Sequence, residues 1–216
     1  MEKYLNDWIK VIEGIKNDNT YKASWGKAII ECIMKKEYQE IDGTIVIEEY
    51  FLVQKLLKYY WNLNVFFDVN QGDYLYVEKL VAEIKEKYEK RRKTSKRWYS
   101  AIETYLKGNQ LSFEKQLSKL ISTVNKNVAY RFLNTGRRKV KLYTLDMTNK
   151  QLRFKPEHVE MIMKYSVLLN ELINYKWIMF LENFNDTRHL AKKVYLVDKD
   201  NITAKKLEQY TSFLNE

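Results

Sequence analysis

Apolar residues recur at helical spacing along most of the chain, so the pattern predicts a mainly helical protein. The first five helices expected from this spacing cover residues 2–16, 23–38, 48–61, 74–92 and 112–133. Pro156 suits the first turn of a long helix over residues 157–184, because proline is tolerated at that position. Thr203 is placed to cap a last helix that runs through Phe213.

Two segments change to the spacing of strands. The β-branched run TIVI predicts a short strand at residues 44–47. Apolar alternation on both sides of the polar turn Thr148–Asn149 predicts a β-hairpin near residues 140–154. The expected fold class is therefore mainly α (α+β), as one compact domain over residues 1–216, with a subdivision into 1–110 and 111–216 as the alternative.

The end of the long helix is unusually aromatic. Trp177, Phe180, Leu181 and Phe184 follow one another at helical spacing in the stretch NYKWIMFLENFN. Such a stripe is typical of a core joint, so we expect these residues to pack on the N-terminal helices. The alternative is an exposed aromatic patch that binds another protein.

Composition favours a compact protein of a reducing compartment. Hydrophobic residues make up 45% of the 216 residues, with one proline and six glycines, which leaves little room for linkers. The single cysteine, Cys32, excludes an internal disulfide and is expected to be buried. Neither a signal peptide nor a membrane-spanning stretch is evident, so we expect a cytoplasmic protein without membrane contact.

Charge is concentrated in the middle of the sequence. Residues 85–155 hold 20 basic and five acidic residues, a charge of +15, whereas the rest of the chain carries −5. This segregation attracts polyanions and makes nucleic acid the leading expected partner, DNA before RNA.

Two basic clusters carry the binding hypothesis. The first, KEKYEKRRKTSKRWY at residues 85–99, interleaves eight basic residues with aromatics that can stack on bases. The alternative for it is a solvated helix end. The second cluster is Arg137, Arg138, Lys139 and Lys141, at the entry to the predicted hairpin. If the clusters face one way they would straddle a duplex, whereas divergent clusters weaken the hypothesis. The expected phosphate contacts are Lys90, Arg91, Arg92, Lys93, Lys96, Arg97, Arg137, Arg138, Lys139 and Lys141.

Signals for catalysis are weak, so we expect no catalytic residue, metal or cofactor in this chain. Glu182, Asp186 and His189 would share a face only if the helix continued through NFND, and are kept as a third hypothesis, a metal nuclease. The EHVE at residues 157–160 is interpreted as structural. The order of elements over residues 23–92 also fits a winged helix at the level of pattern.

Three stretches resemble the N-terminal helical region of a bacterial family of HNH endonuclease domain proteins. They are NTYKASWGKAIIECI (19–33), VNKNVAYRFL (124–133) running into LYTLDMTNKQLRF, and LINYKWIMFLENFN (172–185). In that family a compact HNH module with the metal-dependent cutting site follows. No residue here matches that module, so the resemblance implies a fragment of a larger nuclease or a relative without the cutter.

Together these features predict a non-catalytic nucleic-acid-binding domain or subunit of an HNH-type nuclease, in restriction or anti-phage defence. The alternative is a protein–protein interaction module, such as a defence-complex subunit or a phage-encoded inhibitor. The first hypothesis expects nucleic acid and a nuclease as partners, whereas the second expects another protein.

Overall fold

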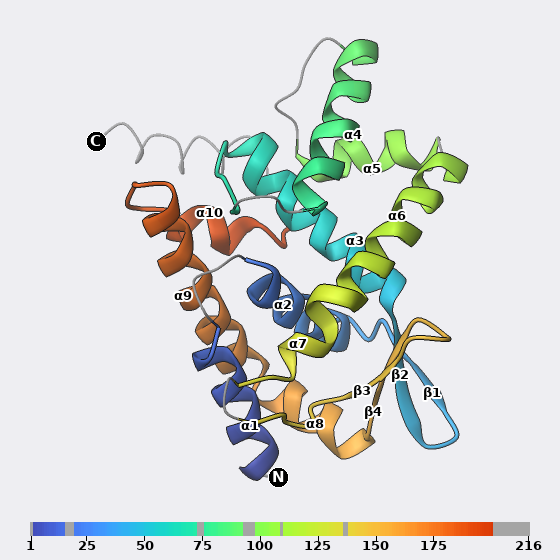
Figure 1. Cartoon of the computed structure of the whole chain (residues 1–216), viewed down its shortest axis with the longest axis vertical. Coiled ribbons are helices and arrows are strands. Elements are labelled where there is room, and N and C mark those ends of the chain that lie inside the picture. Colours follow the sequence, from blue (N-terminus) through green and yellow to red (C-terminus); the bar gives the residue numbers. More distant parts are fainter. Residues whose placement is uncertain are drawn as a thin grey trace.

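The computed structural model describes residues 2–15, 20–72, 76–92, 98–108, 110–135 and 138–200, and it confirms a mainly helical α+β fold (Figure 1). The longer helices are α1 (Glu2–Glu13), α2 (Tyr21–Met34), α3 (Glu49–Tyr60), α4 (Tyr76–Arg92), α5 (Tyr99–Lys107), α6 (Gln110–Val124), α8 (Pro156–Lys164) and α9 (Ser166–Phe184). The shorter elements are α7 (Tyr130–Phe132), α10 (Ala191–Leu196), the π-helical turns η1 (Trp61–Phe66) and η2 (Asn125–Ala129), and the strands β1 (Gln39–Ile41), β2 (Thr44–Glu48), β3 (Thr144–Asp146) and β4 (Gln151–Phe154).

The strands form one antiparallel sheet in the order β1-β2-β4-β3. Both strand segments expected from sequence are present, but their pairing with each other was not predicted: Ile47 lies opposite Leu152, and both side chains are fully buried. Because the sheet is completed by β4, residues 23–92 do not form the self-contained winged-helix unit considered from the sequence.

The hairpin is shorter than predicted, since residues 140–143 lie outside the sheet. Consecutive side chains Leu142 and Tyr143 are both buried, which breaks the alternation that a strand requires. Tyr143 accepts a hydrogen bond from Trp25 Nε1 at 3.0 Å, so this segment is attached to α2 instead.

Helix α2 lies at the centre of the molecule, with α9 on one side and α3 on another (Figure 1). Twelve of its 14 residues are buried. A Cβ at Gly26 would lie 3.0 Å from both Ile173 Cδ1 and Phe132 Cζ. Glycine at this position therefore allows α2 to pack closely against α9 and α7.

The predicted long helix over residues 157–184 is two helices, α8 and α9, which are separated at Tyr165. The Ser166 hydroxyl donates to the Met163 carbonyl at 2.9 Å, and such a local side-chain bond competes with the helical ladder.

The aromatic end of α9 is part of the core, as predicted. Trp177 and Leu181 are fully buried, Phe180 is 6% exposed and Phe184 is half-buried. Trp177 Nε1 donates to Gln71 Oε1 at 3.0 Å, and its ring meets Tyr59 edge-on. The joint lies between α9 and the α2–α3 pair. These aromatic residues therefore pack in the core and do not form the exposed patch that was the alternative.

Helices α5 and α10 were not predicted, and the helix expected over residues 203–213 falls outside the described residues. The buried Asn62, in η1, attaches the start of α5 and the end of α10 to the core. Its Nδ2 donates to the Val197 carbonyl at 3.0 Å, and its Oδ1 accepts from the Tyr99 backbone N–H at 3.0 Å. Short helices fixed by such distant contacts carry little periodic signal of their own.

Candidate nucleic-acid interface

The segment that follows α7 presents two lysines on a regular pattern. Val140 and Leu142 are buried, whereas Lys139 and Lys141 are exposed on the opposite side. Within the described residues, neither Lys139 nor Lys141 takes part in an ion pair. Both ammonium groups are therefore available to an anionic partner.

Three contacts hold this segment in place. Val140 N–H donates to the Leu133 carbonyl at 2.8 Å, and the Tyr4 hydroxyl donates to the Leu142 carbonyl at 2.7 Å. Arg138 Nη2 lies 3.0 Å from Asp7 Oδ1 on α1. Because the backbone is fixed on both sides, the lysines are presented at defined positions rather than on a free loop.

Two hollows of about 470 and 640 Å³ flank the segment and share Lys139, Lys141 and His158 in their linings. Together they are lined by six basic residues and one acidic residue, Asp7. We call these six residues the basic surface: Lys3, Arg138, Lys139, Lys141, Arg153 and Lys155. Its excess of positive charge suits a phosphate backbone.

Part of this charge is offset at the edge of the surface. Arg153 Nη2 lies 3.2 Å from Asp146 Oδ2, and Lys155 Nζ lies 3.7 Å from Glu157 Oε1. The Lys155–Glu157 pair is exposed and the Arg153–Asp146 pair is only partly buried, and such pairs contribute little to stability. Lys139 and Lys141 are accordingly the most direct candidates for phosphate contacts.

Aromatic rings adjoin the basic surface. His158 stacks on Tyr4 with ring centroids 3.7 Å apart and an angle of 12° between the planes. Burial lowers the pKa of His158, so its ring is uncharged at pH 7. Tyr130 is 36% exposed on the edge of the larger hollow, where its ring is available to stack on an unpaired base.

The structure separates the two predicted clusters. Arg138, Lys139 and Lys141 belong to the basic surface, near α1 and α8 at the bottom of Figure 1. Lys90 is near the end of α4 at the top, exposed and paired with Glu86 at 2.6 Å. For Arg91 and Arg92 only the helical backbone is described, and Lys93, Lys96, Arg97 and Arg137 lie outside the described residues. The described members therefore do not form one continuous patch.

Sequence reasoning missed half of the basic surface. Lys3, Arg153 and Lys155 come from parts of the chain far from Lys139, and His158 was interpreted as structural. The sequence held one indication of this: the two-residue spacing of Arg153 and Lys155 places both on the same side of a strand. Their approach to residues 138–141 depends on the tertiary fold.

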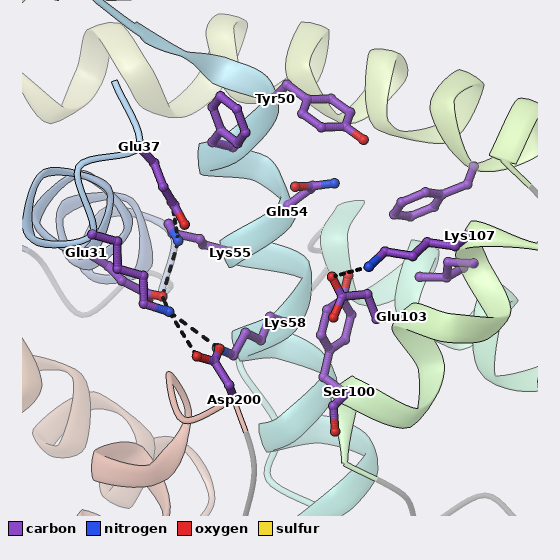
Figure 2. A pocket seen from close by; sticks show the side chains of 15 residues that line it. Glu31, Glu37, Tyr50, Gln54, Lys55, Lys58, Ser100, Glu103, Lys107 and Asp200 are labelled. Atoms are coloured by element: carbon purple, nitrogen blue, oxygen red, sulfur yellow. Dashed lines mark hydrogen bonds and ion pairs between the residues drawn. The ribbon is translucent and has the colours of Figure 1, made fainter. Parts of the chain in front are cut away.

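Another hollow, of about 480 Å³, lies between α3, α5 and α6 (Figure 2). Figure 2 shows Lys55 between Glu31 and Glu37, with the pair Lys107–Glu103 on the opposite wall. Four basic and four acidic residues line it, so it has no charge excess to attract a polyanion. Its ion pairs serve packing of the helices.

The metal-site hypothesis has no support in the described residues, because they contain no group of three His, Cys, Asp or Glu side chains that could hold an ion. Glu182 Oε1 instead accepts a hydrogen bond from the Leu190 backbone N–H at 3.0 Å. Glu182 therefore fixes the chain after α9, and the structure does not bring it together with Asp186 and His189 as a metal site.

Glu49, at the start of α3, is an acid with unusual surroundings. It is 1% exposed, and its Oε2 accepts from Asn125 Nδ2 at 2.8 Å. Glu49 Oε1 and Asn125 Oδ1 are buried without a hydrogen-bond partner in the described structure. Burial raises the pKa of Glu49 to about 7, against the opposing effect of Asn125. A protonated carboxyl supplies a donor where two oxygens lack one, and we interpret Glu49 as structural.

Replacing Glu49 by glutamine is expected to remove a pH dependence of stability. The folded protein retains the Glu49 proton up to pH about 7, whereas the unfolded chain loses it near 4.5, so stability falls as pH rises across this window. We expect the wild type to lose about 1–3 kcal/mol there relative to Glu49→Gln. Urea unfolding of both proteins at pH 4.5 and 7.5 measures the difference, and parallel pH profiles would contradict it.

Comparison with protein-family models, with curated proteins and with solved structures found no match for this chain. None of the helices in the described ranges has the length and hydropathy needed to cross a membrane.

Proposed function

We propose that this chain is a non-catalytic nucleic-acid-binding domain, with DNA preferred to RNA. The observation that supports the proposal is the basic surface, where six basic residues and one acidic residue line two adjoining hollows. Lysine contacts to phosphates release counterions from the nucleic acid, and this release drives binding without a sequence motif.

The fixed backbone around Lys139 and Lys141 adds to this proposal. A charged segment held by Tyr4 and Leu133 loses less conformational freedom on binding than a mobile loop does. The neighbouring Tyr130, which is 36% exposed, provides a flat surface for an exposed base. Both contributions favour binding of a nucleic-acid strand along residues 138–143.

The proposed setting is an HNH-type nuclease of a restriction or anti-phage system, in which this domain positions DNA. This part of the proposal depends on the sequence resemblance. One observation supports treating the three resembling stretches as a single unit, because they meet in the core: Gly26 of the first stretch lies against Phe132 of the second and Ile173 of the third. The basic surface lies outside this shared core.

Reversing both free lysines, Lys139→Glu with Lys141→Glu, tests the binding function. At low salt we expect about a 100-fold loss of affinity for duplex DNA, and a slope of log affinity against log salt that is shallower by about 2. The measurement is fluorescence anisotropy with duplex DNA, single-stranded DNA and duplex RNA over a salt series.

The matched control is Lys115→Glu with Lys119→Glu on α6, which changes the net charge equally and involves exposed lysines away from the basic surface. It should leave most of the affinity in place. Equal losses in both variants would reduce the effect to net charge and overturn the assignment of the surface. Weak, salt-independent binding of the wild type to all three probes would overturn the function itself.

A further inference from the structure

Helix α9 has a second apolar stripe on its outer side. Leu168, Leu172, Tyr175 and Met179 follow one another at intervals of four, three and four residues. Leu168 is 45%, Tyr175 58% and Met179 42% exposed, and Leu172 is half-buried. Since the inner side of α9 already packs on α2 and α1, this stripe is not needed for the core of the domain.

The exposed apolar side chains of the described residues are concentrated around this stripe. Of eleven large hydrophobic residues that are exposed, six lie on α8, α9 and α10, including Met163, Val167 and Tyr195. Such a concentration of exposed apolar side chains is typical of a protein interface. Figure 1 shows α9 along the left edge of the molecule, where a second protein has access to it.

We propose that this face binds a second copy of the chain, with the two α9 helices side by side and parallel. Alternating intervals of four and three residues are the repeat of a two-stranded coiled coil, in which such positions form the seam. The stripe is therefore suited to a helix with the same repeat, and α9 of a second copy is such a helix.

The charges beside the seam select the parallel orientation. Glu171 directly precedes the seam residue Leu172, and Lys176 directly follows the next seam residue, Tyr175. Residues at these two positions are neighbours across a parallel coiled coil. Glu171 then lies beside Lys176 of the partner subunit, and two-fold symmetry repeats the contact. In an antiparallel pair, like charges would face each other instead. The Tyr195 hydroxyl donates to Glu171, which holds this carboxylate at the edge of the seam.

The size of the seam sets the strength of the dimer. Residues 168–179 span about 16 Å of helix, which is short for a coiled coil. We therefore expect an association that depends on concentration, with a dissociation constant on the order of micromolar.

The dimer does not rest on the proposed function, but a parallel pair would bring both basic surfaces to the same end of the assembly, since α8 and the start of α9 lie at that end.

Sedimentation equilibrium of the full chain tests the association, and cysteine crosslinking tests its orientation. In a parallel pair each seam residue meets its own copy, so Leu168→Cys and Met179→Cys should each form a disulfide-linked dimer with oxidised glutathione. In an antiparallel pair, neither would crosslink alone and a mixture of the two would. The native Cys32 is buried, and Met147→Cys in the exposed turn after β3 is the control that should stay monomeric.

Charge exchange keeps the test independent of folding defects at apolar positions. Glu171→Lys and Lys176→Glu should each weaken association about tenfold, and the double variant should restore it. A chain that is monomeric at all concentrations would overturn the proposal, including the case in which residues 201–216 cover the stripe. A dimer that crosslinks only in the mixture, or that is indifferent to the charge exchange, would overturn it as well.

Discussion

Replacing Trp177 by alanine is expected to destabilise the fold by about 3–5 kcal/mol, the range for removing a large aromatic from a core. Its ring is fully buried, meets Tyr59 edge-on and donates to the equally buried Gln71. Alanine would leave a cavity and also an amide oxygen without a donor. Urea unfolding followed by circular dichroism, at low protein concentration so that association does not contribute, measures the loss.

Trp177→Phe is the graded control, because it retains most of the apolar volume and loses only the N–H group. We expect it to cost about 1–2 kcal/mol. If alanine cost no more than phenylalanine, the indole would not anchor the end of α9, and its packing as described would be contradicted.

A loss of similar size, about 3–5 kcal/mol, is expected for Glu31→Ala. The Glu31 carboxylate accepts from the Tyr59 hydroxyl and lies 3.2 Å from Lys55 Nζ, and all three side chains are buried. Removing the acid leaves the Lys55 ammonium with Glu37 alone, at 2.7 Å, and leaves a buried hydroxyl unpaired. Breaking one partner of such a network costs more than the network contributes. Thermal and urea unfolding at pH 7 measure the effect.

Glu31→Gln is the matched control, since it retains an acceptor for Tyr59 and removes only the charge. Burial would raise the pKa of Glu31, but Lys55 and the Tyr59 hydroxyl outweigh it and hold the pKa below the ordinary value of 4.5. The stabilisation is therefore present above pH 4.5 and is lost as pH falls through the lower, folded-state pKa. The wild type should lose its advantage over Glu31→Gln on acidification; an advantage independent of pH would contradict the ionised pair.

Periodicity was sufficient for the helices with one apolar face. The range predicted for α4 and the start of α8 at Pro156 agree closely with the structure, because burial of one face decides both the pattern and the packing. Periodicity failed where the structure is decided by contacts other than the burial of one apolar face. The pairing of β2 with β4 joins residues that are far apart in the chain, which local spacing does not register. The break at Tyr165 accompanies a local bond of the Ser166 hydroxyl, which the spacing of apolar residues does not register either.

The candidate interface was likewise predicted in part from the sequence. Alternation in residues 139–142 indicates that Lys139 and Lys141 share a side, and the structure confirms that both are exposed. Lys3 joins them because α1 is attached to this segment by the Asp7–Arg138 pair and by the hydrogen bond from Tyr4 to the Leu142 carbonyl, a contact between residues 138 positions apart. A cluster of charge in the sequence is therefore only part of a charged surface, and the rest is assembled by the fold.

The central position of α2 has a consequence for synthesis of the protein. Twelve of its 14 residues are buried, and one side of the helix is covered by α9, which begins at Ser166. At 5–20 residues per second, α9 leaves the ribosome roughly ten seconds after α2. During that interval the side of α2 that α9 covers stays exposed on the nascent chain, so the N-terminal half is the part expected to need a chaperone.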